Sequence, residues 1–170
     1  KIDWSTYKPP VPKYFGTKQY GPYDLGELVP YIDWTPFFQT WELTGQYPSI
    51  LEDDKVGEAA RGLFKDAQEM LQKLVDEKWL TAKAVVGFWP ATSEGDDIVI
   101  YGDKARKFPI HTLHTIRQQM SRESDKPNQA LADFIAPIGK GEDFIGGFAV
   151  TSGHGEDEHI KRFEAEKDDY

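Results

Sequence analysis

The sequence contains no cysteine, which excludes disulfide bonds, thiolate zinc sites and thiol nucleophiles. Long apolar runs are also missing, because the longest, at 84–89, falls far short of the ~20 residues that a membrane-spanning helix needs. Basic residues are scarce: 20 Lys and Arg stand against 29 Asp and Glu, and the net charge is −9. This charge argues against a surface for nucleic acid or anionic membranes. The lack of cysteine fits the cytoplasm, which is the location we expect.

The chain also lacks an initiator methionine and a signal-peptide pattern, since it starts at Lys1. We therefore expect a piece of a longer protein or a processed product. A length of 170 residues with 39% hydrophobic residues predicts a single soluble domain, 1–170, with a real core. No internal repeat or low-complexity tract is present.

Large aromatic residues are concentrated between residues 31 and 54. The six rings of this stretch are Tyr31, Trp34, Phe37, Phe38, Trp41 and Tyr47. Few surfaces absorb so many large rings, so most of them should lie in a core or line a pocket.

Asp33 is a carboxylate within this aromatic stretch and has two interpretations. It can cap a helix that begins at Thr35 and Pro36, because proline at a first helical position after an acidic cap is a common start. It can also take the charge of a small cationic ligand while neighbouring rings stack on that ligand. Spacing alone favours the cap, since caps are far commoner than ligand-binding carboxylates.

The clearest helix is predicted over residues 55–78, where apolar residues follow the 3.6-residue period and define one buried stripe. Asp54 should cap this helix, and Glu52 and Asp53 should complement its dipole. The three acids also resemble a metal site, but helix-start chemistry explains them better.

Shorter patterns predict the remaining elements, and together they indicate an α+β fold. Their ranges are an extended N-terminal arm over about 1–15 anchored by Trp4 and Tyr7, a helix from 23 to 28 ended by Pro30, a strand at 82–88 closed by Pro90, a turn at 93–97, strands at 98–101 and 107–112, a helix at 113–120, a surface loop at 121–129, a buried strand at 144–151 and a helix at 156–170.

Several polar groups invite a chemical role, and each has a simpler explanation. His111 and His114 suit metal ligation, but no third ligand follows at a known spacing, so a strand-end and helix-start pair is favoured. The turn at 152–155 lies where anions bind, yet it lacks a phosphate-loop pattern. Ser152 and His154 alone do not indicate a hydrolase triad.

Two further features concern packing rather than chemistry. Gly87, Gly146 and Gly147 lie within predicted strands and indicate close packing or the close approach of a ligand. Arg117 is expected to form a surface salt bridge rather than a buried ion pair.

The order of short motifs along the chain resembles one family closely. The motifs are I-D-W-T-P-F-F (32–38), G-Q-Y-P (45–48), I-L-E-D-D (50–54), V-G-E-A (56–59), V-V-G-F-W-P-A (85–91), D-D-I-x-x-Y (96–101), R-Q-Q (117–119), L-x-D-F-I-A-P (131–137), D-F-I-G-G-F-A-V-T (143–151) and D-D-Y (168–170), with D-W-x-x-Y-x-P-P, F-G-T and Y-D-L-x-x-L-V before them. This series resembles the S-adenosylmethionine-binding activation domain at the C-terminus of cobalamin-dependent methionine synthase.

The resemblance implies a fold, a ligand and a role. The fold would be a twisted antiparallel sheet flanked by helices. The aspartate of I-D-W, which is Asp33 here, would bind S-adenosylmethionine, with a lesser contribution from Trp34. The module would hold this methyl donor over cobalamin carried by a neighbouring domain, so that oxidised cobalamin is reductively methylated in a methyltransferase of methionine biosynthesis. Flavodoxin or a flavoprotein reductase would supply electrons, and no residue of the module would act as acid, base or nucleophile.

The family domain extends beyond D-D-Y with an arginine and a R-P-A-P-G-Y-P pattern that supply much of its ligand site, so this chain would hold only the first part. Two alternatives follow from other features. A non-catalytic module could dock a reductase or the cobalamin domain through its acidic surface. A carbohydrate-binding module, suggested by 14% aromatic residues, would need exposed coplanar rings.

Overall fold

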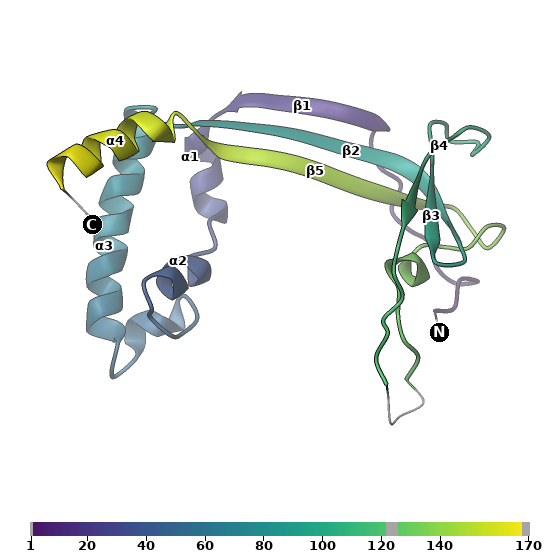
Figure 1. The fold of residues 1–170 in the computed structure, drawn as a ribbon, viewed down its shortest axis with the longest axis horizontal. Coiled ribbons are helices and arrows are strands. Elements are labelled where there is room, and N and C mark those ends of the chain that lie inside the picture. The colour runs from purple at the N-terminus through teal and green to yellow at the C-terminus, as the bar shows by residue number, and fades with distance from the viewer. Residues whose placement is uncertain (1, 122–125, 168–170) are drawn as a thin grey trace. The chain divides into compact units, whose positions relative to one another are not determined.

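The computed structural model describes residues 2–121 and 126–167 of the chain. These residues form two compact units, which we describe separately (Figure 1). Unit 1 comprises Lys1–Gln19 and Ala84–Ala149, and unit 2 comprises Tyr20–Lys83 and Val150–Tyr170. The expected single domain over 1–170 stays a prediction. The terminal D-D-Y motif and part of the predicted loop at 121–129 fall outside the described residues.

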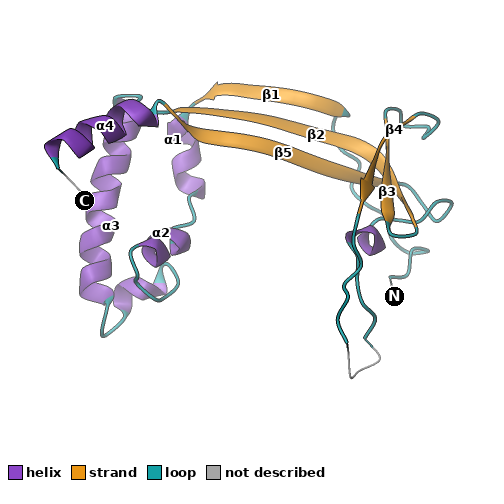
Figure 2. Cartoon of the chain, in the orientation of Figure 1, coloured by secondary structure: helices purple, strands orange, loops and turns teal. Residues whose placement is uncertain are grey.

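Strands and helices both contribute to the fold, which confirms the α+β class (Figure 2). The strands join in one sheet with the order β1-β2-β3-β4, and β5 pairs with β2. The strand bounds are β1 (Gly16–Tyr23), β2 (Thr81–Glu94), β3 (Asp97–Tyr101), β4 (Pro109–His114) and β5 (Asp143–His154). The helices are α1 (Leu25–Leu28), α2 (Thr35–Thr40), α3 (Gly57–Asp76) and α4 (Glu156–Glu166), with 3₁₀ turns η1 (Val29–Tyr31), η2 (Ser49–Glu52) and η3 (Leu131–Phe134).

The strands predicted at 82–88 and 98–101, with a turn between them, form an antiparallel hairpin whose turn is tighter than expected. β2 and β3 are antiparallel with Glu94 opposite Asp97, so only Gly95 and Asp96 form the loop. Gly95 has a φ of +63°, a conformation that glycine adopts without steric cost. β4 continues the antiparallel pairing on β3, which confirms the strand predicted near 107–112.

The predicted end of the second strand at Pro90 is wrong, because β2 runs on to Glu94. Proline's fixed φ is compatible with an extended strand, and only its missing N–H disturbs a ladder. Pairing with β3 begins at Ala91, so the missing N–H of Pro90 falls outside that ladder. The Pro90 side chain is fully buried.

Two predictions about neighbouring strands also fail. β1 is absent from the predicted elements, although it pairs with β2. β5 is present, but it is not buried: Phe148 is 78% exposed and Val150 is 67% exposed. The run of apolar residues correctly indicates a strand, but it does not show what covers that strand.

The predicted glycine packing is real at two of the three positions. A Cβ on Gly87 would lie 2.1 Å from the Trp89 ring, and one on Gly146 would lie 2.9 Å from the Phe88 ring. Gly147 has open space around it. Close packing against aromatic rings of the same sheet therefore explains Gly87 and Gly146.

The arm before β1 contains no helix or strand, as predicted from its prolines. The rings of Trp4 and Tyr7 meet edge to face, with centroids 5.3 Å apart. Burial and the nearby carboxylate of Asp143 raise the pKa of the Tyr7 hydroxyl. Tyr7 thus rests against the start of β5 within unit 1, as expected of an anchor.

The predicted helix at 113–120 does not form. Its first two residues belong to β4, and the rest has no regular structure. The backbone N–H groups here donate to distant partners, Thr115 to the Asp96 carbonyl and Gln118 to the Gln129 carbonyl. These bonds replace the i to i−4 bonds of a helix.

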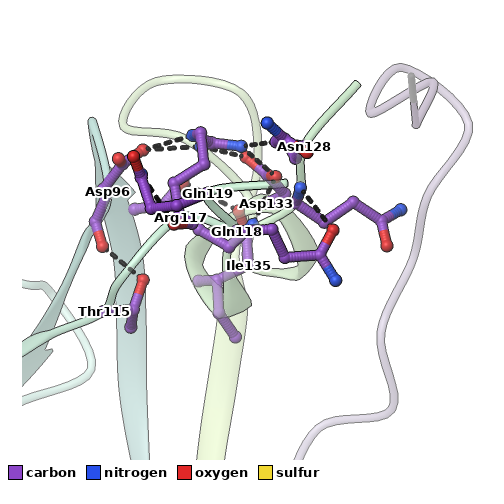
Figure 3. Close-up of polar contacts among 11 residues, drawn as sticks. Asp96, Thr115, Arg117, Gln118, Gln119, Asn128, Asp133 and Ile135 are labelled. Carbon is purple, nitrogen blue, oxygen red and sulfur yellow. Dashed lines mark hydrogen bonds and ion pairs between the residues drawn. The ribbon is translucent and has the colours of Figure 1, made fainter. Parts of the chain in front are cut away.

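Arg117 organises this irregular segment through two carboxylates (Figure 3). Its guanidinium donates to both oxygens of Asp133, at 2.6 and 2.8 Å, and to Asp96 from Nε at 3.0 Å. It also donates to the Asn128 carbonyl at 2.8 Å. The Arg117 side chain is 32% exposed and its partners Asp96 and Asp133 are 46% and 37% exposed, so the expected surface salt bridge is confirmed, as a bidentate network with two carboxylates.

Unit 2 is built around a core of Phe38, Ile50 and Ala60. The α3 helix confirms the prediction over 55–78, but its apolar stripe is only partly buried. Seven half-buried residues pack on this core: Trp34, Phe37, Leu43, Leu51, Val56, Leu63 and Phe64. Further along α3 the stripe opens to solvent, and Met70 is 40% exposed.

The helix starts of unit 2 follow the predicted chemistry with changes in detail. Asp24 caps α1 by accepting from the Gly26 N–H, and α1 ends at Leu28 as predicted, with Pro30 in the 3₁₀ turn η1 that follows. Before α3 the bonding carboxylate is Asp53, not Asp54: it accepts from Lys55 and Val56 N–H groups, which lowers its pKa. In the described part of the chain, no helix is both long and apolar enough to cross a membrane.

Replacing Phe38 by alanine should lower the free energy of unfolding by about 3–5 kcal/mol, because the ring is completely buried in the unit 2 core. Urea denaturation followed by circular dichroism measures this change. Tyr31→Ala removes an aromatic ring that is 85% exposed and should cost less than about 0.5 kcal/mol. Equal effects of the two substitutions would contradict the assignment of the core.

The Arg117 network makes unit 1 sensitive to acid. Hydrogen bonds from Arg117 and from the Ala130 N–H lower the pKa of Asp133 from its usual 3.8 to about 2. Because the folded value is the lower one, the stabilisation is complete above the unfolded pKa and is lost as pH falls through the folded value. Urea denaturation between pH 6 and 2.5 should show Asp133→Asn destabilised at the upper end, with the difference from the native chain shrinking towards the lower end.

The matched control for this titration is Asp54→Asn, which removes an exposed carboxylate outside the network. It should track the native chain across the same range. A difference between Asp133→Asn and the native chain that stays constant with pH would contradict a stabilising role of the ionised Asp133.

Candidate functional site

Asp33 lies in unit 2, between η1 and the start of α2. Its Oδ1 atom accepts a hydrogen bond of 3.0 Å from the N–H of Thr35, the first residue of α2, and Pro36 follows as predicted. The helix-start interpretation of Asp33 holds in part: Asp33 bonds the first N–H of α2, but the N-cap position belongs to Trp34, whose side chain makes no capping hydrogen bond. The carboxylate is nevertheless exposed, and among residues 2–121 and 126–167 it forms no ion pair. It can accept a ligand cation without giving up a protein partner.

Trp34 ends the short loop between η1 and α2, in which Asp33 also lies. Its ring meets Phe37 and Phe64 edge to face, with centroid distances of 5.4 and 5.0 Å. Because Phe64 belongs to α3, this contact fixes the start of α2 on the longest helix of the unit. The Tyr47 N–H donates to Thr35 Oγ1 at 3.2 Å and ties the chain after α2 to the same point.

The six rings of the central stretch are distributed between core and surface. Only Phe38 is fully buried, while Trp34 and Phe37 are half-buried. Tyr31, Trp41 and Tyr47 are exposed, but Trp41 lines the cavity described below, so the expectation that most rings lie in a core or line a pocket holds for four of the six. Trp34 packs edge-on to its neighbours and does not contribute a flat platform of the kind that the carbohydrate-binding alternative requires.

A groove in unit 2, which we call the α3/α4 groove, is separate from Asp33. It has a volume of about 900 Å³ and lies between residues of α2, α3 and α4 and the segment after α3. Its apolar lining residues are Phe37, Trp41, Leu63, Ala67, Met70, Leu74, Trp79, Leu80, Ile160 and Phe163. Phe37 and Trp41 therefore line a cavity, as predicted for the rings of the central stretch, whereas Asp33 and Trp34 do not.

The other candidate sites do not assemble. His111 and His114 both lie in β4, and His114 Nδ1 contacts Asp97 at 3.0 Å. No cluster of three or more potential metal ligands occurs among the described residues, at Glu52–Asp54 or elsewhere. Ser152 and His154 lie near the end of β5, and Gly155 is the N-cap of α4, with a φ of +106°. Ordinary strand and turn chemistry explains these positions.

Sequence reasoning missed the α3/α4 groove, although a signal for it is present. Leu63, Ala67, Met70 and Leu74 belong to the apolar stripe of α3, which was assigned wholly to the core. The apolar stripe of α3 is longer than the core of unit 2 needs. This excess length is the signal that could have indicated a solvent-exposed apolar face on α3.

Comparison with known proteins identifies the family of the chain. The family described as "Vitamin B12 dependent methionine synthase, activation domain" matches residues 24–170. A solved structure described as "Crystal Structure of the MetH Reactivation Domain bound to AdoHcy" is 48% identical in sequence and superimposes with a TM-score of 0.88. The match covers 100% of this chain and 52% of that one, so the chain spans about half the length of that structure. The same fold and the family match together show that the chain belongs to the activation-domain family of vitamin B12-dependent methionine synthase.

Proposed function

We propose that this chain is the S-adenosylmethionine-binding part of a reactivation module in a cobalamin-dependent methionine synthase. One observation carries the proposal: the solved reactivation domain at 48% identity, matched over the whole of this chain, is bound to AdoHcy. AdoHcy is what S-adenosylmethionine becomes after it has given up its methyl group, so a site for one has the shape needed for the other.

Asp33 is the residue that we propose to contact the ligand. S-adenosylmethionine carries a cationic amino group, and an exposed carboxylate without an ion pair among the described residues suits it. The Thr35 N–H holds one carboxylate oxygen in place, at 3.0 Å, and leaves the other oxygen to a ligand. The site is thus partly preorganised, which reduces the ordering cost of binding.

Trp34 is a lesser part of the proposed site. Its ring is half-buried against Phe37 and Phe64, so its main contribution is to hold the Asp33 loop on α3. Trp34 is only half-buried, so part of the residue is open to a ligand.

The chemistry of the module is positioning rather than acid–base catalysis. When bound, S-adenosylmethionine supplies an electrophilic sulfonium methyl group, and the protein's task is to hold it in place. We propose that a neighbouring cobalamin-binding domain presents the acceptor and that flavodoxin or a flavoprotein reductase supplies electrons. The whole enzyme would transfer a methyl group from methyltetrahydrofolate to homocysteine. The cytoplasmic location of the protein stays a prediction.

Calorimetric titration of the chain with S-adenosylmethionine tests the proposal. Asp33→Ala should weaken binding by roughly tenfold or more, because a charge-assisted hydrogen bond contributes about 1.5–3 kcal/mol. Asp33→Asn should weaken it nearly as much while still accepting the Thr35 N–H, which separates ligand contact from helix capping.

Asp24→Asn is the matched control, since Asp24 also caps a helix in unit 2, through the Gly26 N–H. It should bind as tightly as the native chain. Equal affinities of Asp33→Asn and the native chain would refute the role of Asp33. If the folded native chain does not bind at all, S-adenosylmethionine binding does not reside in these 170 residues, and the proposal fails for this chain.

A further inference from the structure

The floor of the α3/α4 groove is a regular seam of apolar side chains. Leu63, Ala67, Met70 and Leu74 line it from α3, at alternating spacings of four, three and four residues. This is the spacing with which helices present a continuous ridge to a partner helix. At a rise of 1.5 Å per residue, the seam is about 16 Å long and matches roughly three turns of a facing helix.

The walls of the groove are apolar as well, and they are open to solvent. Ile160 and Phe163 line it from α4, Phe37 lines it from α2, and Trp41 lines it from the position just after α2. Met70 is 40% exposed, Ile160 is 48% exposed and Trp41 is 40% exposed. Large side chains exposed side by side in one groove, rather than scattered singly, mark an interaction site.

The rim of the groove is predominantly acidic. The lining residues of the groove include four carboxylates: Asp66, Glu69, Glu156 and Glu164. Lys73 is the one lysine or arginine among the described residues that line it. Lys65 contacts Glu69 at 3.6 Å, but both side chains are largely exposed, so this pair is weak and can exchange. An acidic rim around an apolar floor is complementary to a segment with an apolar ridge and basic flanks.

Three basic side chains near the groove contact one ring, that of Trp79. His159 stacks on the Trp79 ring at 4.1 Å, and Lys73 and Arg162 lie over the same ring at 5.1 and 4.7 Å. Lys73 lies on α3 between Met70 and Leu74, so the lining of the groove carries four carboxylates against this one lysine. A second copy of this acidic chain is a poor occupant, because like charges would face each other.

We propose that the α3/α4 groove binds an amphipathic helical segment of another protein or domain, with leucine-like residues at helical spacing and lysine or arginine on its flanks. The helix lies along α3, and its apolar ridge packs between Met70 and Ile160. This docking function is separate from the proposed S-adenosylmethionine site, since Asp33 and Trp34 do not line the groove.

The probe for this proposal is a fluorescein-labelled 18-residue peptide of leucine and lysine, with leucines at alternating three- and four-residue spacing. Fluorescence anisotropy measures its binding to the 170-residue chain. A second peptide of the same composition, with leucine and lysine alternating, keeps the charge but not the helical ridge. A third peptide has glutamate in place of lysine and keeps the ridge but not the charge.

The native chain should bind the first peptide and bind the other two at least roughly tenfold more weakly, with affinity falling as salt rises. Met70→Glu should also weaken binding by roughly tenfold, because it buries a charge under the apolar ridge. Gln68→Glu adds the same charge on exposed α3 surface outside the groove and should leave binding within about twofold of native. Ile160→Glu tests the opposite wall, and circular dichroism checks that each variant is folded.

Several results would overturn the proposal. Absence of binding by the native chain, equal binding of the alternating peptide, or equal binding by folded Met70→Glu and Ile160→Glu would each do so. Sedimentation of the native chain as a dimer that Met70→Glu converts to a monomer would show that a second copy is the occupant instead. None of these results bears on whether the chain binds S-adenosylmethionine, so this proposal and the proposed function can fail independently.

Discussion

The packing of the first half of α3 around Phe38 is the constraint on which unit 2 depends. Phe38 and Ile50 are separated by the loop after α2, and both pack with Ala60 of α3 in one core. Phe64, one turn further along α3, contacts the Trp34 ring at 5.0 Å. Asp33 is the neighbour of Trp34, and Trp34 packs on Phe64 of α3. The position of the Asp33 carboxylate therefore depends on the packing of these apolar rings.

The same helix serves a different purpose in its second half. There the stripe faces the α3/α4 groove instead of the core, and its side chains remain partly exposed. One amphipathic helix thus stabilises the unit through one segment and presents a surface through the other. The carboxylate at the start of α2 and the groove along α3 are separate surfaces of one compact unit.

Predictions from local pattern succeeded where the bonding itself is local. Asp33, Thr35 and Pro36 are neighbours in the chain, and the hydrogen bond that begins α2 spans two residues. The β2–β3 hairpin likewise depends on a two-residue loop with Gly95 at positive φ. The segment at 113–120 failed for the opposite reason. Its pattern predicts a helix, but Arg117 bonds Asp96 and Asp133 instead, which lie 21 and 16 residues away in the sequence. Local pattern carries no information about such distant partners.

The sequence by itself determined the motif order that indicates the family, the position of α3 and the start of α2, because these depend on residue identity and short-range periodicity. Tertiary structure alone decided which apolar residues are covered: Phe38 is fully buried and Phe148 is 78% exposed, although both are phenylalanines in apolar stretches. It also decided that Asp53 rather than Asp54 bonds the backbone before α3. The physical reason is that burial and hydrogen bonding depend on which distant segments meet, whereas periodicity reports only that a face of an element is apolar.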